Sequence, residues 1–131
     1  MSTTIRPKIS EKNKYAIGKH RYYELKHFVM QYPEWKTRTI DISFDERWPS
    51  DPTHNEAALR EEYITKIHMI DICAKETDPI IGPIIVKGIL DGSSFDILKL
   101  RFNIPCCRDI YYTLYRKFFW LLDKTRKYQP L

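Results

Sequence analysis

The sequence predicts an all-α protein of five to six helices, with a helix-turn-helix near its C-terminal end. Apolar residues recur at intervals of three and four along most of the chain, which is the spacing of one face of a helix. Proline, glycine and aspartate separate these periodic segments. The one segment that alternates polar and apolar residues, 37–44, has no evident partner strand, so we favour continuation of a helix there over a short extended piece.

Composition and length indicate one folded domain. The chain has 131 residues and a hydrophobic content of 43%, which is enough for a modest core. We expect a flexible basic tail over residues 1–14 and a single helical domain over 15–131. No apolar run approaches a membrane span, no signal-peptide pattern opens the chain, and three cysteines make no disulfide framework. We therefore expect an intracellular protein with no membrane partner.

The first half of the chain is expected to form two consecutive helices. Residues 19–31 are predicted to be helical. The apolar residues that follow the helical period here are Tyr22, Leu25, Phe28, Val29 and, just beyond this range, Tyr32. Pro33 can open a second helix, because its missing amide costs nothing in a first turn. We expect Trp35 in that helix to pack back on the first. Residues 45–55, with two prolines, are expected to form a loop.

The middle of the chain predicts a long helix and then a very apolar one. The long helix, about 55–77, has one face formed by Leu59, Tyr63, Ile67, Ile70 and Ala74. Asp78 and Pro79 interrupt it. The next helix should be the most buried, and its apolar residues are Ile80, Ile81, Ile84, Ile85, Ile89 and Leu90. A buried strand would also suit this run, but Gly82 and Pro83 argue against a central strand.

Residues 94–127 carry the predicted helix-turn-helix. Ser93 or Ser94 can cap a short helix whose stripe is Phe95, Leu98 and Phe102. Pro105 ends the break and is expected in the first turn of a second helix over about 106–122. Its predicted core residues are Ile110, Leu114, Phe118 and Leu121, widened by Tyr111, Tyr115 and Leu122. Its predicted outer residues are Arg108, Asp109, Tyr112, Thr113, Arg116 and Lys117. An ordinary helical hairpin has the same periodicity.

Charge is unevenly distributed along the chain. Residues 94–131 hold eight Lys/Arg and three Asp/Glu, a net charge of +5, whereas residues 51–93 hold four and eight, a net charge of −4. This favours a polyanionic partner for the C-terminal third, although surface lysines that serve only solubility are the alternative. We expect Tyr112 and Trp120 to be exposed for contact with a partner, and Tyr111 and Phe118 to pack in the core.

Motifs of catalysis or metal binding are absent from the sequence. It contains no glycine-rich phosphate loop, no hydrolase or kinase signature, and no metal-ligand spacing among its four histidines and three cysteines. We therefore expect a protein that is not an enzyme, with no catalytic residue, metal or cofactor. The adjacent Cys106 and Cys107, at a helix start, could have lowered thiol pKa values.

Two segments, SFDILKLRFNIP and RDIYYTLYRKFFWLL, resemble the C-terminal helix-turn-helix of the RinA-like and ArpU-like late-gene transcription regulators of phages and prophages. A further segment, DPTHNEAALREEYITKI, resembles part of other phage proteins, so the resemblance covers about residues 51–127. It implies a phage-derived regulator that binds double-stranded DNA in the cytoplasm of a bacterial host cell. It also implies an RNA polymerase contact or a homodimer.

The resemblance implies a role for each basic residue near the turn. Lys99 and Arg101 would contact phosphates, and Arg108, Asp109 and Tyr112 would face the major groove from the recognition helix, about 106–122. The adjacent cysteines depart from the polar residues usual at the start of that helix.

Further along the same helix, Arg116 and Lys117 would grip the DNA backbone. Another class of function is open: a phage-encoded inhibitor of a host nuclease or CRISPR effector (an anti-CRISPR protein), which acts by contact with that host defence protein. A packaging or scaffold protein is a third possibility.

Overall fold

All regular structure in the described residues of the computed structural model, 14–43 and 54–128, is helical, which confirms the all-α prediction. The helices are α1 (Lys19–Met30), α2 (Tyr32–Ser43), α3 (His54–Thr77), α4 (Ile81–Asp91), α5 (Phe95–Phe102) and α6 (Arg108–Tyr128). None of them combines the length and the apolar character needed to cross a bilayer. The predicted tail, 1–14, and the predicted loop, 45–55, lie almost wholly outside the described residues.

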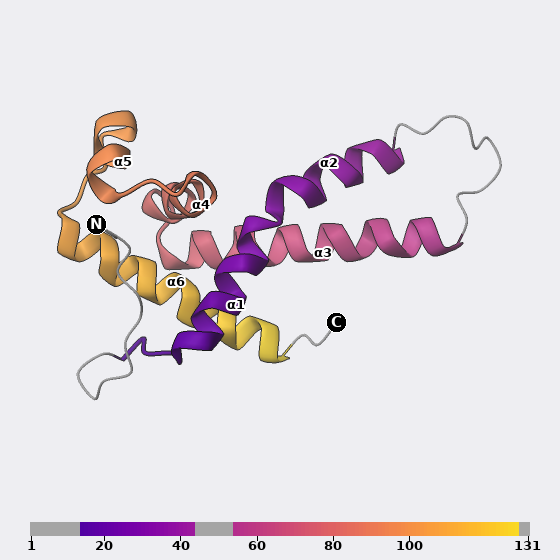
Figure 1. Cartoon of the computed structure of the whole chain (residues 1–131), viewed down its shortest axis with the longest axis horizontal. Helices are drawn as coiled ribbons and strands as arrows, with labels where there is room; N and C mark the ends of the chain where they lie inside the picture. Colours follow the sequence, from indigo (N-terminus) through magenta and orange to yellow (C-terminus); the bar gives the residue numbers. More distant parts are fainter. Residues whose placement is uncertain (1–13, 44–53, 129–131) are drawn as a thin grey trace.

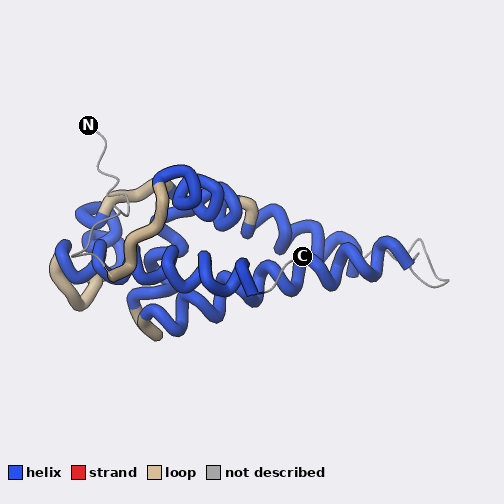
Figure 2. The backbone as a smooth tube through the Cα atoms, turned by 90° about the horizontal axis from the view of Figure 1, so that it is seen from below, coloured by secondary structure: helices blue, strands red, loops and turns tan. Residues whose placement is uncertain are grey.

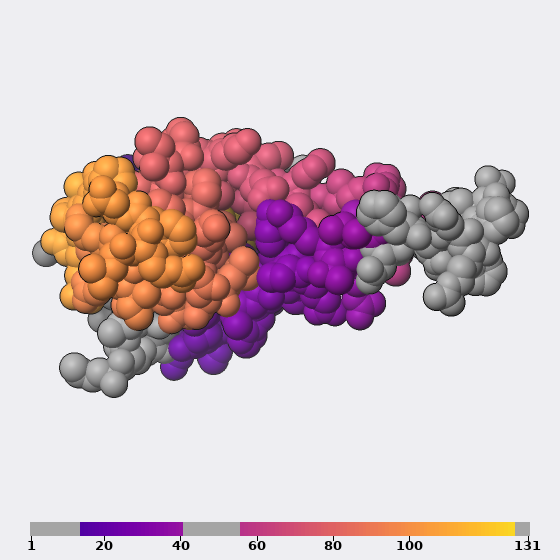
Figure 3. Space-filling model, turned by 90° about the horizontal axis from the view of Figure 1, so that it is seen from above, coloured from indigo at the N-terminus to yellow at the C-terminus, as the bar shows by residue number. Residues whose placement is uncertain are grey.

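The helices form an elongated arm and a body (Figures 1 and 2). The arm consists of α2 and the first half of α3, which lie side by side. The second half of α3 continues into the body, where it packs against α4 and α6. Helix α5 and the start of α6 lie at the end of the body that is remote from the arm (Figure 3).

The boundary between α1 and α2 follows the prediction. Helix α1 ends before Pro33, and α2 starts around that proline and continues as a helix to Ser43. The ring of Trp35 lies edge-on to Phe28 with 4.9 Å between their centroids. Helix α2 thus packs on α1 as predicted, and the alternative extended piece over 37–44 is wrong for its described part.

A carboxylate and a glycine set the turn from α3 to α4. The Asp78 Oδ1 accepts hydrogen bonds from the amides of Ile80 at 2.9 Å and Ile81 at 2.8 Å, so it caps α4. Ile80 therefore stays outside the helix and is exposed, which corrects its predicted burial. A Cβ on Gly82 would lie 1.8 Å from the carbonyl oxygen of Ala74. Only glycine allows α4 to begin so close to α3.

The break between α5 and α6 is longer than predicted. Asn103 ends α5 in the left-handed conformation, with φ of 50°. Ile104 then inserts into the core, 1% exposed, and the chain uses residues 105–107 to turn before α6 begins. Pro105 therefore precedes the first turn of α6, and α6 covers Arg108–Tyr128 rather than about 106–122.

The buried face of α6 is centred on aromatic residues, and it is rotated from the predicted face. Its buried side chains are Tyr111, Tyr112, Tyr115, Phe118, Phe119, Leu122 and Asp123. Ile110, predicted to be in the core, is exposed. Tyrosine can occupy the core here because its hydroxyl finds a partner, as Tyr115 does with the Tyr22 hydroxyl at 2.7 Å.

Candidate nucleic-acid interface

The side of α6 that faces away from the core carries a basic stripe. Its residues, here called the outward stripe, are Thr113, Arg116, Lys117, Trp120 and Lys124. They share one face because residues three, four and seven apart align on a helix. Within the described part of the chain, no carboxylate lies within ion-pair distance of the three cations of the stripe. The stripe therefore presents uncompensated positive charge.

Aromatic rings alternate with these cations. The Lys124 ammonium lies 3.5 Å from the centroid of the Trp120 ring, and Tyr15 packs edge-on to that ring at 5.3 Å. Lys14 in turn lies 5.0 Å from the Tyr15 ring centroid. Trp120 is therefore half-buried under Tyr15 rather than freely exposed, which corrects the prediction. Rings among cations are a common arrangement in surfaces that bind nucleic acids.

The two predicted phosphate contacts of α5 are both held by local partners. The Lys99 ammonium donates to the carbonyl oxygen of Ile104 at 3.2 Å. The Arg101 guanidinium pairs with the Asp91 carboxylate at 3.1 Å. The hydrogen bond of Lys99 is part-buried, whereas the ion pair of Arg101 is exposed, screened by water and worth little. They lie on α5, away from the outward stripe of α6.

The start of α6 carries three of the predicted groove residues, and only two of them are exposed. Arg108 lies 3.9 Å from the Asp96 carboxylate of α5, and Asp109 is exposed. Tyr112 is 5% exposed, and its hydroxyl accepts the amide of Phe95 at 3.4 Å. The expected outward position of Tyr112 is therefore corrected: it joins α5 to α6 instead. It also takes over the capping role expected of Ser93 or Ser94, since Ser94 makes no side-chain cap bond.

Arg116 and Lys117 lie on the outward stripe as predicted, and Lys117 also forms a hydrogen bond to α3. Its ammonium donates to the carbonyl oxygen of Thr77 at 3.4 Å. Thr77 ends α3, so the positive charge lies at the negative end of that helix. Of the seven predicted residues, the structure brings Asp109, Arg116 and Lys117 to one face of α6 and leaves the other four elsewhere.

The basic residues at the C-terminal end of α6 make contacts within the protein, so they are less available to a partner than the outward stripe is. The Arg126 guanidinium lies 3.9 Å from the Phe28 ring centroid, and burial together with the nearby Arg21 lowers the pKa of Arg126. Lys127 pairs with the buried Asp123 at 3.2 Å. Sequence reasoning missed Tyr15 as a neighbour of the stripe, because no periodicity connects that residue with α6.

The adjacent cysteines precede α6 rather than start it. Cys106 is half-buried and Cys107 is exposed. Burial, followed by the neighbouring Cys107, raises the pKa of the Cys106 thiol. The expectation of a lowered pKa is therefore wrong for Cys106, because burial disfavours its charged thiolate.

Comparison of the chain with known protein families, with curated proteins and with solved structures gives no significant match.

Proposed function

We propose that this protein is a phage-derived transcription regulator that binds double-stranded DNA with α5 and α6 as its helix-turn-helix. The outward stripe is the observation that supports the proposal: Arg116, Lys117 and Lys124 lie on one face of a long helix, and none of the described carboxylates pairs with them. Phosphates attract such a face, and a helix fits the major groove.

The inner side of α6 supplies the rigidity that groove binding needs. Phe118, Phe119 and Leu122 are fully buried, and the Tyr112 hydroxyl holds the first amide of α5. Helix α5 therefore keeps a fixed position against the start of α6. In this arrangement Arg116 and Lys124 contact phosphates, while Arg108, Asp109 and Thr113, toward the N-terminal end of α6, lie nearest to base edges.

Fluorescence anisotropy with a labelled duplex, at 50 and 200 mM salt, tests the proposal. We expect affinity to fall steeply with salt, and the double variant Arg116→Gln/Lys124→Gln to reduce the slope of log K against log salt by about two. The control is Lys36→Gln/Lys75→Gln, since these lysines line a hollow between α2, α3 and α4. Absence of binding at 50 mM salt, or the same slope in both double variants, would overturn the proposal of DNA binding through the outward stripe.

A second candidate function rests on α5. Leu100 is 88% exposed and Ile97 is 49% exposed on this helix, and exposed apolar side chains are typical of protein contacts. They favour the alternative of a phage-encoded inhibitor that binds a host nuclease or CRISPR effector. Inhibition assays with purified effectors would test it, and Leu100→Ser should abolish inhibition while it leaves DNA affinity unchanged.

A further inference from the structure

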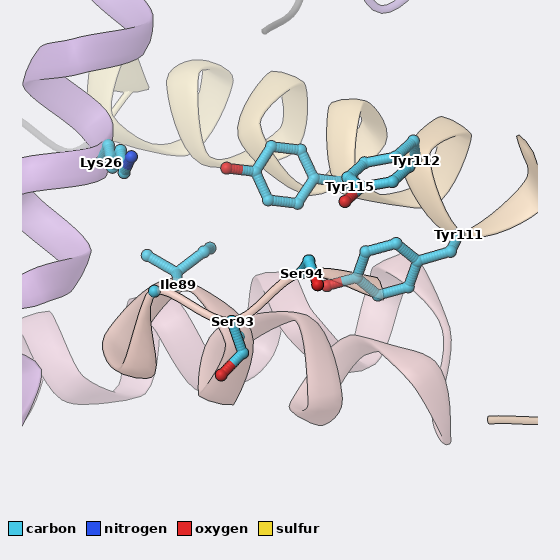
Figure 4. A pocket seen from close by; sticks show the side chains of 9 residues that line it. Lys26, Ile89, Ser93, Ser94, Tyr111, Tyr112 and Tyr115 are labelled. Carbon is cyan, nitrogen blue, oxygen red and sulfur yellow. The ribbon is translucent and has the colours of Figure 1, made fainter. Parts of the chain in front are cut away.

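Two hollows beside α4 differ greatly in size. The smaller is a cavity beside Tyr111, between α1, the turn from α4 to α5, and α6 (Figure 4), and its volume is about 50 Å³. Since a single water needs roughly 10–15 Å³ in this measure, it has room for about three or four waters. The larger hollow lies between α2, α3 and α4, and its volume is about 380 Å³. Pockets for small organic ligands measure about 300–1,000 Å³, so this hollow, here called the lysine pocket, is large enough for one.

Apolar side chains form much of the wall of the lysine pocket. They are Ala74 from α3 and Pro83, Val86 and Leu90 from α4, and the ring of Tyr32 adds to them from α2. Both α2 and α4 pack against α3 along neighbouring parts of its length (Figure 1). The pocket therefore lies where the arm joins the body, and a flat apolar ligand would bury its surface there.

Three lysines also line the pocket, one from each helix: Lys36, Lys75 and Lys87. In the part of the chain that the structure describes, no carboxylate lies within ion-pair distance of their ammonium groups. Lys36 lies 4.8 Å from the Tyr32 ring centroid, whereas Lys87 lies 5.4 Å from the ring centroid of Phe102 on α5. Charges of one sign around an apolar hollow concentrate the electric field there and attract a ligand of opposite charge.

Among the described residues that line the pocket, Asp71 alone carries a carboxylate, and it is hydrogen-bonded. The Tyr32 hydroxyl donates to Asp71 Oδ1 at 2.7 Å. Burial, followed by the bond to Asp71, raises the pKa of Tyr32, so the hydroxyl stays protonated and keeps this bond. Three positive charges therefore face one negative charge around the pocket, and the excess is positive.

We infer that the lysine pocket binds a small organic anion with a flat apolar part, an aromatic carboxylate or a nucleoside monophosphate. The flat part lies against the Tyr32 ring and Val86, and the anionic group faces Lys36 and Lys75. The inference does not depend on the proposed DNA binding, because the lysine pocket and the outward stripe share no residue.

Isothermal titration of the full chain with naphthoate and, separately, with adenosine monophosphate tests the inference. We expect saturable binding of one molecule per chain, and the anion that binds more tightly identifies the class of ligand. Naphthamide, which has nearly the shape of naphthoate but no charge, should bind about tenfold or more weakly, because hydrogen bonds to a charged group are the stronger ones.

Two double variants that remove the same charge locate the site. Lys36→Gln/Lys75→Gln should weaken naphthoate binding by about tenfold or more, whereas Arg116→Gln/Lys124→Gln on the outward stripe should leave it unchanged. In DNA binding the two variants exchange roles, so failure of one proposal is distinguishable from failure of the other. Asp71→Asn should tighten naphthoate binding, because it removes the negative charge beside the anion while its amide oxygen can still accept from Tyr32.

Any of three outcomes refutes the inference: no saturable binding of either anion, equal affinity for naphthoate and naphthamide, or the same naphthoate affinity in Lys36→Gln/Lys75→Gln as in the unmodified protein. Weaker binding of naphthoate by Asp71→Asn would also contradict it, since an anion in this pocket is repelled by that carboxylate.

Discussion

The Arg21 guanidinium of α1 holds the Asp123 carboxylate of α6 with an Nε to Oδ1 distance of 2.6 Å, and Asp123 is almost fully buried. A buried carboxylate depends on its partner far more than an exposed one does. Asp123→Asn, which keeps the volume but removes the charge, should lower the free energy of unfolding by about 2 kcal/mol. Urea denaturation measures this change.

The control for Asp123→Asn is Glu34→Gln, which breaks the exposed pair between Arg38 and Glu34 at 3.2 Å. Exposed pairs contribute little, so a loss below about 0.5 kcal/mol is expected. Equal losses in both variants would contradict the structural role assigned to Asp123.

Gly82 and Gly92 should respond very differently to a methyl group. Gly82→Ala places a Cβ against the Ala74 carbonyl, so α3 and α4 must separate, at a cost of about 3 kcal/mol or more. At Gly92 there is open space, and only its φ of +67° disfavours alanine, for about 1 kcal/mol. Thermal unfolding of the two variants gives the comparison. A similar loss in both would mean that α3 and α4 are further apart.

Alkaline pH should destabilise the fold through its buried tyrosines. Burial, followed by the neighbouring Tyr22, raises the pKa of Tyr115, and burial raises that of Tyr111. The folded state therefore keeps these protons, whereas the unfolded chain loses them above about pH 10. Stability is fully present below that pH and falls above it, by about 1.4 kcal/mol per pH unit for each tyrosine.

Urea denaturation between pH 8 and pH 11 measures this slope. Tyr111→Phe should reduce the slope, since one raised pKa fewer contributes to it. An unchanged slope in Tyr111→Phe would contradict the burial of its hydroxyl.

Arg108→Ala tests the predicted position of Arg108 in the major groove. On a duplex selected from a random library, the variant should lose about 1–3 kcal/mol of binding free energy and relax the preference at one position. Lys75→Ala serves as the control. Unchanged affinity and preference would show that Arg108 serves only its pair with Asp96.

Local sequence patterns were sufficient for most helix bounds. Proline at α2, the aspartate cap at α4 and the stripe of α5 each act within a few residues, so they can be read directly. The orientation of α6 could not be read in this way. It depends on where distant residues such as Tyr22 and Arg21 offer partners to Tyr115 and Asp123. Hydrophobicity alone favours isoleucine over tyrosine for the core. On α6 the opposite is found, because Tyr115 has a hydrogen-bond partner on α1 and Ile110 is exposed.

In the candidate site, too, the sequence predicted the residues that helical spacing places and missed those that distant contacts place. Arg116 and Lys117 lie on the outer face of α6 because that assignment requires only helical spacing. Tyr112 was misplaced since its burial depends on the Phe95 amide of another helix. The cavity beside Tyr111 gave no signal in the sequence, because it joins residues from α1, a turn and α6.

Helix α3 belongs to both the arm and the body, and its two halves should therefore differ in local stability. Near Glu56 it packs against α2, whereas Ile70 and Cys73 are fully buried among α4 and α6. Amide protons along this one helix should exchange with solvent in a gradient, fastest near Glu56 and slowest around Ile70. Fraying of the arm can then proceed inward turn by turn, and it stops where the body begins.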